Sequence, residues 1–194
     1  YTVTPSAVGF STGSSGNYNS IAYATGTLTI SSTALVVTAN TVGPITYGDA
    51  TPTNGYTTSG LNTSTTTITV TYSYQGTGST SYSSSATPPT AAGTYTITPV
   101  VTFTTGSAST YSSVTYTSSN FTINKKVLTA TATTATATYG DTTPTYNVSV
   151  TGFANSETTS TAAGYVAPTC SSSYSATTAV GTSVSFTCSG GSAN

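Results

Sequence analysis

Ionisable residues are scarce in this chain of 194 residues, and their scarcity excludes several classes of protein. Charged residues make up 3% of the sequence, against roughly 25% in ordinary soluble domains. Two basic residues cannot form the positive track with which a protein binds nucleic acid. Because histidine is absent, a Ser-His-Asp catalytic set is excluded. Three acidic residues, two of them in repeated turns, nearly exclude the carboxylate pair of a glycosidase.

Apolar residues are also limited, at 35% of the sequence, and no run of them approaches the roughly 18 residues of a membrane-spanning helix. We therefore expect no membrane span in this chain, and a thin core of the kind found between two packed sheets. The sparse Cys and acidic residues predict no metal site, no cofactor and no catalytic residues. Serine and threonine supply the polarity instead, while 15 tyrosines in strand-like runs argue against disorder.

Two nearly identical segments, TYGDATPT and TYGDTTPT, lie 92 residues apart. A second pair, AYATGTLTI and TYTSSNFTI, ends at Ile30 and Ile123, which are 93 positions apart. A third pair is YTVTP near the N-terminus and YTITP from Tyr95. Three landmarks at one spacing predict a tandem repeat of one module of about 93 residues.

The repeated segment has the composition of a tight turn. It places the same four residue types in each copy: Tyr47, Gly48, Asp49 and Pro52 in the first, and Tyr139, Gly140, Asp141 and Pro144 in the second. The glycines can adopt positive φ, the aspartates can cap backbone donors, and the prolines stiffen the chain that follows. We interpret the aspartates as structural, because one carboxylate per module is a poor calcium site.

The spacing of these landmarks divides the chain into three parts. Residues 1–32 resemble the C-terminal strands of a preceding module, 33–125 form a complete module, and 126–194 form a second module without its final strands. Two hypotheses follow. The chain is an excerpt of a longer array of repeats, or it is a subunit whose N-terminal strands complete the module of a neighbour by donor-strand exchange.

Side chains alternate with a period of two through most of the chain, which is typical of strands with one buried face. Apolar residues take every second position in Tyr95–Phe103, Ile68–Tyr74, Val148–Val150 and Val184–Cys188. The best helical candidate is only a turn, at Gly152–Thr158. We predict an all-β fold of tandem immunoglobulin-like β-sandwich modules with short antiparallel strands, and a β-grasp-like sheet is the alternative.

The second copy resembles the bacterial MBG domain of the YGX type. The resemblance rests on YGDTTPTYNVSVTGFANSET (Tyr139–Thr158), on PTC and VGT, and on FTCSGGSAN (Phe186–Asn194). The first module keeps YGDATPT and AAGTYTI but has a different middle and no cysteines. The resemblance implies the repetitive stalks of secreted or surface-anchored adhesins, and it assigns no binding role to any residue.

Cys170 and Cys188 are the only cysteines, and we expect them to form a disulfide in an oxidising compartment, with Cα atoms about 5.5 Å apart. Asn62, Asn120 and Asn147 begin glycosylation sequons, which also arise by chance in a chain rich in Ser, Thr and Asn.

Lys125 and Lys126 lie at the predicted module junction, either as a solvated linker or as partners in an isopeptide cross-link. The only acid outside the repeated turns is Glu157.

The sequence therefore favours a non-enzymatic structural protein of the cell exterior, whose repeats form an extracellular filament, pilus-like fibre or adhesin stalk. Its expected partners are copies of itself or neighbouring repeats. The alternative is a module that binds glycans or mucin, for which an exposed tyrosine cluster in a cleft is expected.

Overall fold

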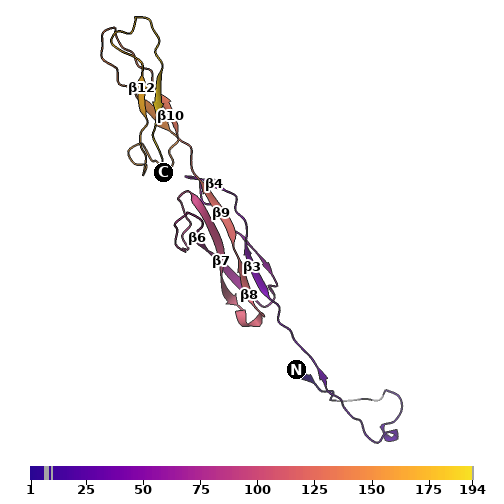
Figure 1. Cartoon of the computed structure of the whole chain (residues 1–194). Coiled ribbons are helices and arrows are strands. Elements are labelled where there is room, and N and C mark those ends of the chain that lie inside the picture. The colour runs from indigo at the N-terminus through magenta and orange to yellow at the C-terminus, as the bar shows by residue number, and fades with distance from the viewer. Residues whose placement is uncertain (7–8, 10, 194) are drawn as a thin grey trace.

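Strands separated by turns make up nearly all the regular structure, as the alternating pattern predicts. The computed structural model describes residues 1–6, 9 and 11–193. In it the chain is elongated, with an extended hairpin at the N-terminus, a two-sheet sandwich in the middle and a smaller strand-rich part at the far end (Figure 1). The all-β class is therefore confirmed, while the immunoglobulin-like assignment stays a prediction. Among the described residues, no helix is long and apolar enough to cross a membrane.

The central part, which we name the first sandwich, contains two sheets. The three-stranded sheet has the order β5-β3-β8 and consists of β3 (Leu35–Ala39), β5 (Tyr56–Ser59) and β8 (Val114–Thr117). The four-stranded sheet has the order β4-β9-β7-β6 and consists of β4 (Ile45–Thr46), β6 (Thr67–Gly76), β7 (Gly93–Thr105) and β9 (Ser119–Asn124). A short 3₁₀ turn, η2 (Ala108–Thr110), precedes β8.

Two strand pairs in the first sandwich are parallel, and they are exceptions to the predicted antiparallel strands. β3 pairs with β8, and β4 pairs with β9, in parallel. The physical reason lies in the connections. The chain passes from β3 to β4, and later from β8 to β9, by moving to the other sheet without reversing direction. As a result, β3 and β8 lie side by side in one sheet, and β4 and β9 lie side by side in the other.

The core of the first sandwich consists of the inward side chains of the alternating runs. In β7, Tyr95 and Ile97 are 2% and 1% exposed, while the threonines between and beyond them reach the surface. Phe121 and Ile123 of β9 are equally buried, at 2% and 3%. The Tyr95 ring lies 6.2 Å from that of Phe121. The period-two pattern thus placed the buried face of β7 correctly.

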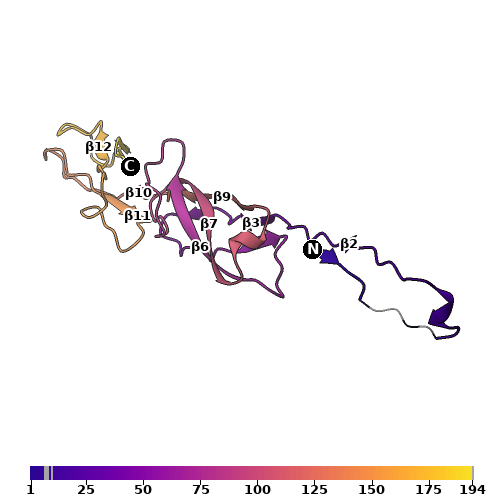
Figure 2. The same ribbon diagram turned by 90° about the horizontal axis from the view of Figure 1, so that it is seen from below.

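The N-terminal segment, residues 1–34, extends away from the first sandwich at the end opposite the C-terminus (Figures 1 and 2). Its regular structure is a two-residue pairing between β1 (Thr2–Val3) and β2 (Gly26–Thr27), and the turn η1 (Ser15–Asn17). Leu28 and Ile30 are 52% and 71% exposed. Since it points away, this segment does not pack back onto the C-terminal part of its own chain.

The C-terminal part, which we name the C-terminal module (128–193), contains two small sheets. β10 (Thr129–Ala132) pairs with β11 (Val148–Thr151), and β12 (Thr169–Ser172) pairs with β13 (Phe186–Ser189). The core is thin: the rings of Tyr146 and Phe186 stack at 4.6 Å, and Ala154 is the buried hydrophobic residue among those described here. β10 pairs with β11 in the same register as β3 pairs with β5: residues of β10 lie 93 positions after their counterparts in β3, and residues of β11 lie 92 positions after those in β5.

Because two of its tyrosine phenols are buried, the first sandwich should become less stable at alkaline pH. Burial raises the pKa of Tyr95 above its ordinary value of 10.0, and the Tyr82 phenol adds to the rise. The pKa of Tyr72 is raised by burial and then by Tyr56 and Tyr74. An unfolded chain loses these protons at lower pH than the folded chain does, so the folded state binds more protons in that interval. The contribution of these two phenols to the free energy of unfolding is complete below a pH of about 10, and it is lost as pH rises through the folded pKa values.

We predict that the free energy of unfolding falls above a pH of about 10, and that Tyr95→Phe makes this fall less steep. Tyr95→Phe also removes the hydrogen bond that its Oη donates to the Ala91 carbonyl at 2.7 Å, so the slope with pH, and not the absolute stability, is the readout. Denaturant unfolding at several pH values measures that slope. Tyr116→Phe is the control, since this side chain is 47% exposed, and equal slopes in both variants would contradict the prediction.

Candidate functional site

The first YGD turn is a capped reversal that follows β4. Gly48 has φ +93°, a conformation that favours glycine. The Thr46 N–H donates to Asp49 Oδ2 at 2.8 Å, and the Asp49 N–H donates back to the Thr46 carbonyl at 2.9 Å. The aspartate therefore caps backbone groups inside its own turn. In the described part of the chain, no group of three or more Cys, Asp and Glu is placed to hold a metal ion.

The second YGD turn has the same geometry. Gly140 again has φ +93°. The Thr138 N–H donates to Asp141 Oδ2 at 2.9 Å, and the Asp141 N–H donates to the Thr138 carbonyl at 3.0 Å. Pro52 and Pro144 are both half-buried after their turns. The two turns are therefore built alike, and what differs between them is their surroundings.

The first YGD turn packs against a turn of the C-terminal module. Tyr47 Oη donates a hydrogen bond of 2.6 Å to Glu157 Oε1, and this contact is partly buried. A Cβ placed on Gly48 would lie 2.4 Å from the Cβ of Ala154, a residue that is only 7% exposed. The alanine methyl thus occupies the space that any side chain at position 48 would need. Glycine is required here by its φ and also by the close approach of the second turn.

The receiving turn lies where the sequence predicted one, within Gly152–Thr158. The Glu157 N–H donates to the Ala154 carbonyl at 2.8 Å, and Asn155 and Ser156 have φ values of 51° and 60°. Asn and Ser here adopt the left-handed conformation that closes this tight reversal. The reversal projects the methyl of Ala154 and the carboxylate of Glu157 toward the first sandwich.

A hollow of about 330 Å³ lies beside this contact. Its lining includes six alanines together with Tyr47, Glu157 and the two lysines. Lys125 and Lys126 are exposed in the connection between β9 and β10, as expected of a linker. The isopeptide hypothesis stays a prediction. The lining is mainly apolar and carries one acid, which suits the packing of two bodies.

The second YGD turn has no such partner in the described chain. Tyr139 is 63% exposed, and a Cβ on Gly140 would meet no atom within 4 Å. The turn is held from its own side, because Tyr174 Oη donates to the Thr138 and Asp141 carbonyls at 3.2 and 3.3 Å. One copy of the motif is therefore covered and the other is open.

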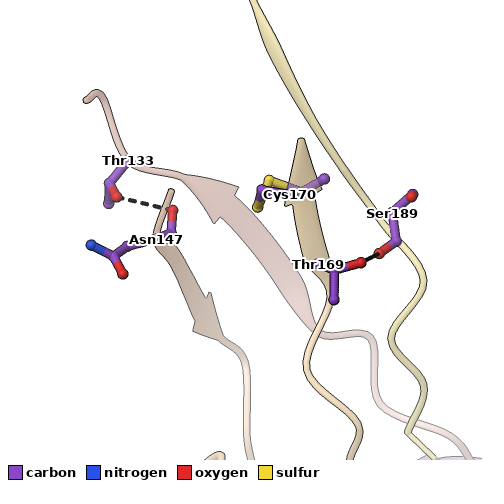
Figure 3. The surroundings of a disulfide bond; sticks show 6 residues. Thr133, Asn147, Thr169, Cys170 and Ser189 are labelled. Carbon is purple, nitrogen blue, oxygen red and sulfur yellow. Dashed lines mark hydrogen bonds between the residues drawn. A yellow bond between two sulfur atoms is a disulfide. The ribbon is translucent and has the colours of Figure 1, made fainter. Parts of the chain in front are cut away.

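Cys170 and Cys188 are joined by a disulfide between β12 and β13 (Figure 3). Their Cα atoms are 3.9 Å apart, so the expected separation of about 5.5 Å is wrong. The reason is that the two cysteines face each other directly across the strand ladder. Beside them, Thr169 Oγ1 donates to the Ser189 carbonyl at 3.5 Å. The bond ties together the two strands of one small sheet.

The three sequon asparagines are exposed. Asn62 lies in the turn after β5, where its Oδ1 accepts from the Ser64 N–H at 3.1 Å. Asn120 lies in β9, and Asn147 accepts from Thr133 Oγ1 at 2.9 Å through its carbonyl (Figure 3). Their glycosylation stays a prediction.

Sequence reasoning did not find the contact between the YGD turn and the Ala154–Glu157 turn. The only available signal was Glu157 itself, an isolated acid in a chain with almost none. Nothing in a single sequence connects it with Tyr47, 110 residues away.

We predict that Gly48→Ala is more harmful than Gly140→Ala. Both glycines have φ +93°, so both variants carry a similar backbone strain of about 1–2 kcal/mol. Only the first brings a Cβ against Ala154, which should lower the free energy of unfolding by about 1–3 kcal/mol more. Trypsin reports on this contact, because both lysines lie at the junction and loss of the contact should speed cleavage after them. Equal cleavage rates in the two variants would contradict the proposed importance of the contact between Gly48 and Ala154.

We predict that replacing both cysteines by serine destabilises the C-terminal module by roughly 3 kcal/mol, since the bond closes a loop with a sequence separation of 18. The first sandwich should be unaffected. Hydrogen exchange resolves the two parts, and exchange in β12 and β13 should accelerate. Thr187→Ser, an exposed change on β13, is the control. Unaltered protection in the double variant would show that the bond is dispensable.

Residues 128–194 match the family of the MBG domain, YGX type. No curated protein and no solved structure matches the chain significantly. The matched segment contains the open YGD turn, the Ala154–Glu157 turn and both cysteines. The match and the disulfide are consistent with an extracellular, adhesin-like repeat module. The similarity to the MBG domain of the YGX type thus covers residues 128–194, about a third of the chain.

Proposed function

We propose that this protein is a non-enzymatic structural protein of the cell exterior. Its copies join end to end into a pilus-like filament or adhesin stalk by strand exchange. The N-terminal segment of one copy supplies strands to the C-terminal module of the next. The observation that carries the proposal is a pair of apolar side chains that are exposed in this segment but buried at the matching positions of the first sandwich.

That pair is Leu28 and Ile30, in the segment GTLTI. The matching segment of β9 contains Phe121 and Ile123, each 93 positions later. Phe121 and Ile123 are 2% and 3% exposed, whereas Leu28 and Ile30 are 52% and 71% exposed. Burying side chains of this size is worth about 1.5–3 kcal/mol each. The segment thus has the apolar pattern of a buried strand, but its apolar side chains are not buried.

The same segment also matches β8. Ile21 and Tyr23 lie 93 positions before Val114 and Tyr116, and both are 44% exposed. In the first sandwich β8 joins the three-stranded sheet and β9 joins the four-stranded sheet. Residues 21–30 therefore have the pattern to supply one strand to each sheet of a module.

The C-terminal module has edges that such strands would fit. In the first sandwich β3 lies between β5 and β8, and β7 lies between β6 and β9. Among the described strands of the C-terminal module, β10 pairs only with β11, and β13 only with β12. Unpaired edges invite another strand unless charge or proline blocks them. Lysines, the usual edge protection, are missing from this module.

The composition supports a structural role outside the cell. A net charge of −1 leaves almost no repulsion between copies. The disulfide suits an oxidising environment. The polar surface rests on Ser and Thr hydroxyls, which do not titrate in the physiological range. Such a surface is adapted to dense packing under varied conditions.

We predict that Leu28→Asp together with Ile30→Asp abolishes assembly. Each change places a charge where the proposal requires burial, and an unpaired buried charge is strongly unfavourable. Thr27→Asp is the matched control: it lies in the same segment but corresponds to Asn120, which is exposed. Electron microscopy and light scattering of the purified chain measure assembly, with filaments expected for the wild type and for Thr27→Asp.

A wild-type chain that stays monomeric at high concentration, with Leu28 and Ile30 still exposed, would overturn the proposal. A monomer that also binds defined glycans on an array would favour the alternative, a glycan- or mucin-binding module. Filaments that persist unchanged in the double variant would show that assembly uses some other surface.

A further inference from the structure

We infer that the open turn Tyr139–Asp141 is a docking surface for the turn Asn62–Thr65 in the first sandwich of a second copy. This inference rests on the proposed strand exchange and adds the contact that would set the angle between successive copies. The precedent is inside the chain: the first YGD turn already packs against the Ala154–Glu157 turn of the C-terminal module. The open turn has the same geometry as the covered one.

The two candidate receiving turns occupy matching positions in their modules, although the left-handed φ values of Asn155 and Ser156 have no counterpart at Thr63 and Ser64. Ala154–Glu157 begins three residues after β11 ends, and Asn62–Thr65 begins three residues after β5 ends. The Glu157 N–H donates to the Ala154 carbonyl at 2.8 Å, and the Thr65 N–H donates to the Asn62 carbonyl at 3.2 Å. All four residues from Asn62 to Thr65 are exposed. The first sandwich therefore presents an unoccupied counterpart of the turn that covers Gly48.

The open turn also lies at the correct end of its module. β10 starts at the junction with the first sandwich and runs away from it, so the residues between β10 and β11 lie at the far end (Figure 1). Tyr139 and Gly140 belong to this connection and do not line the junction hollow. Segment 174–176 contacts this turn from its own module, yet Tyr139 stays 63% exposed, and a copy added there would continue the long axis.

The segment that precedes the C-terminal module and the segment that precedes the first sandwich have the same length, so the existing contact and the proposed one are spanned equally. Four residues, 124–127, separate Ile123 at the end of the core strand from Leu128. Four residues, 31–34, likewise separate Ile30 from Leu35. If residues 26–30 take the β9 position in the C-terminal module of a neighbour, the donor's first sandwich follows at the same chain distance. Its Asn62–Thr65 turn then arrives over the acceptor's Tyr139–Asp141 turn.

The chemistry of the predicted contact resembles that of the existing one but is uncharged. Gly140 leaves space for the Cβ of Asn62, as Gly48 does for that of Ala154. Thr65 takes the place of Glu157, so the Tyr139 Oη–H would donate to a hydroxyl and not to a carboxylate. Hydrogen bonds to ionised acceptors are roughly twice as strong as those to neutral ones. The contact between copies should therefore be weaker than the contact within one.

Cross-linking between two cysteine variants tests this inference. Thr65→Cys copies and Tyr139→Cys copies are mixed, assembled and treated with a short bis-maleimide, while the native disulfide leaves no other thiol to react. We expect a covalent dimer of the two variants. Tyr47→Cys with Glu157→Cys in one chain is the positive control for reach, since these side chains touch. Val166→Cys in place of Tyr139→Cys is the negative control, on an exposed residue outside the turn.

A gain-of-function variant tests the same contact by a second route. Thr65→Glu recreates the Tyr–Glu pair, so we expect the critical concentration for assembly to fall about threefold to tenfold. Tyr139→Phe removes the donor and should cancel that gain.

Filaments that form without this cross-link, and without any gain in Thr65→Glu, would overturn the docking inference while leaving strand exchange intact. A chain that forms no filaments at all, with Leu28→Asp and Ile30→Asp making no difference, would overturn both.

Discussion

The constraint on which this structure depends is the need to close a sheet edge when almost no charge is available to protect it. In the first sandwich β9 meets this need: it pairs with β7 on one side and β4 on the other, and it buries Phe121 and Ile123. Soluble proteins commonly guard an open edge with lysine, proline or a bulge. Here both lysines are in a connection between strands, so pairing with another strand is the available solution.

The same constraint links the exposed N-terminal segment to the C-terminal module. The N-terminal segment has exposed apolar side chains in the pattern of β8 and β9. The described strands of the C-terminal module are each paired on one side only. Main-chain hydrogen bonds would give such an exchange its affinity, and the alternating apolar side chains would give it its register. Neither part requires a charged group, which fits a chain with so few of them.

The YGD turn has two roles that the structure separates. Its internal hydrogen bonds are the same in both copies and form the turn. Its glycine leaves a gap that a neighbouring turn can enter, and in the first copy Ala154 does so. A small residue facing a side-chain-free residue lets two backbones approach closely. Such an approach sets the orientation of adjacent bodies more firmly than a flexible linker does.

Much of this was accessible from the sequence. The alternation in Tyr95–Phe103 identified the buried face of β7, because side chains of a strand point to opposite sides in turn. The composition of the YGD segment predicted a capped turn, because Gly and Asp satisfy local geometric needs. The spacing of the landmarks relates Leu28 to Phe121 by sequence alone. Each of these inferences depends only on residues close together in the chain.

Tertiary structure decided the rest. The parallel pairing of β3 with β8 and of β4 with β9 follows from where the chain changes sheets, which no local pattern records. The meeting of Tyr47 with Glu157 depends on how two bodies pack across a short connection. The close approach of Ala154 to Gly48 and the open space around Gly140 come from the same four-residue motif in different surroundings. Local patterns of residues thus specify the strands and turns, whereas the packing of distant segments selects which copy of the YGD turn is covered.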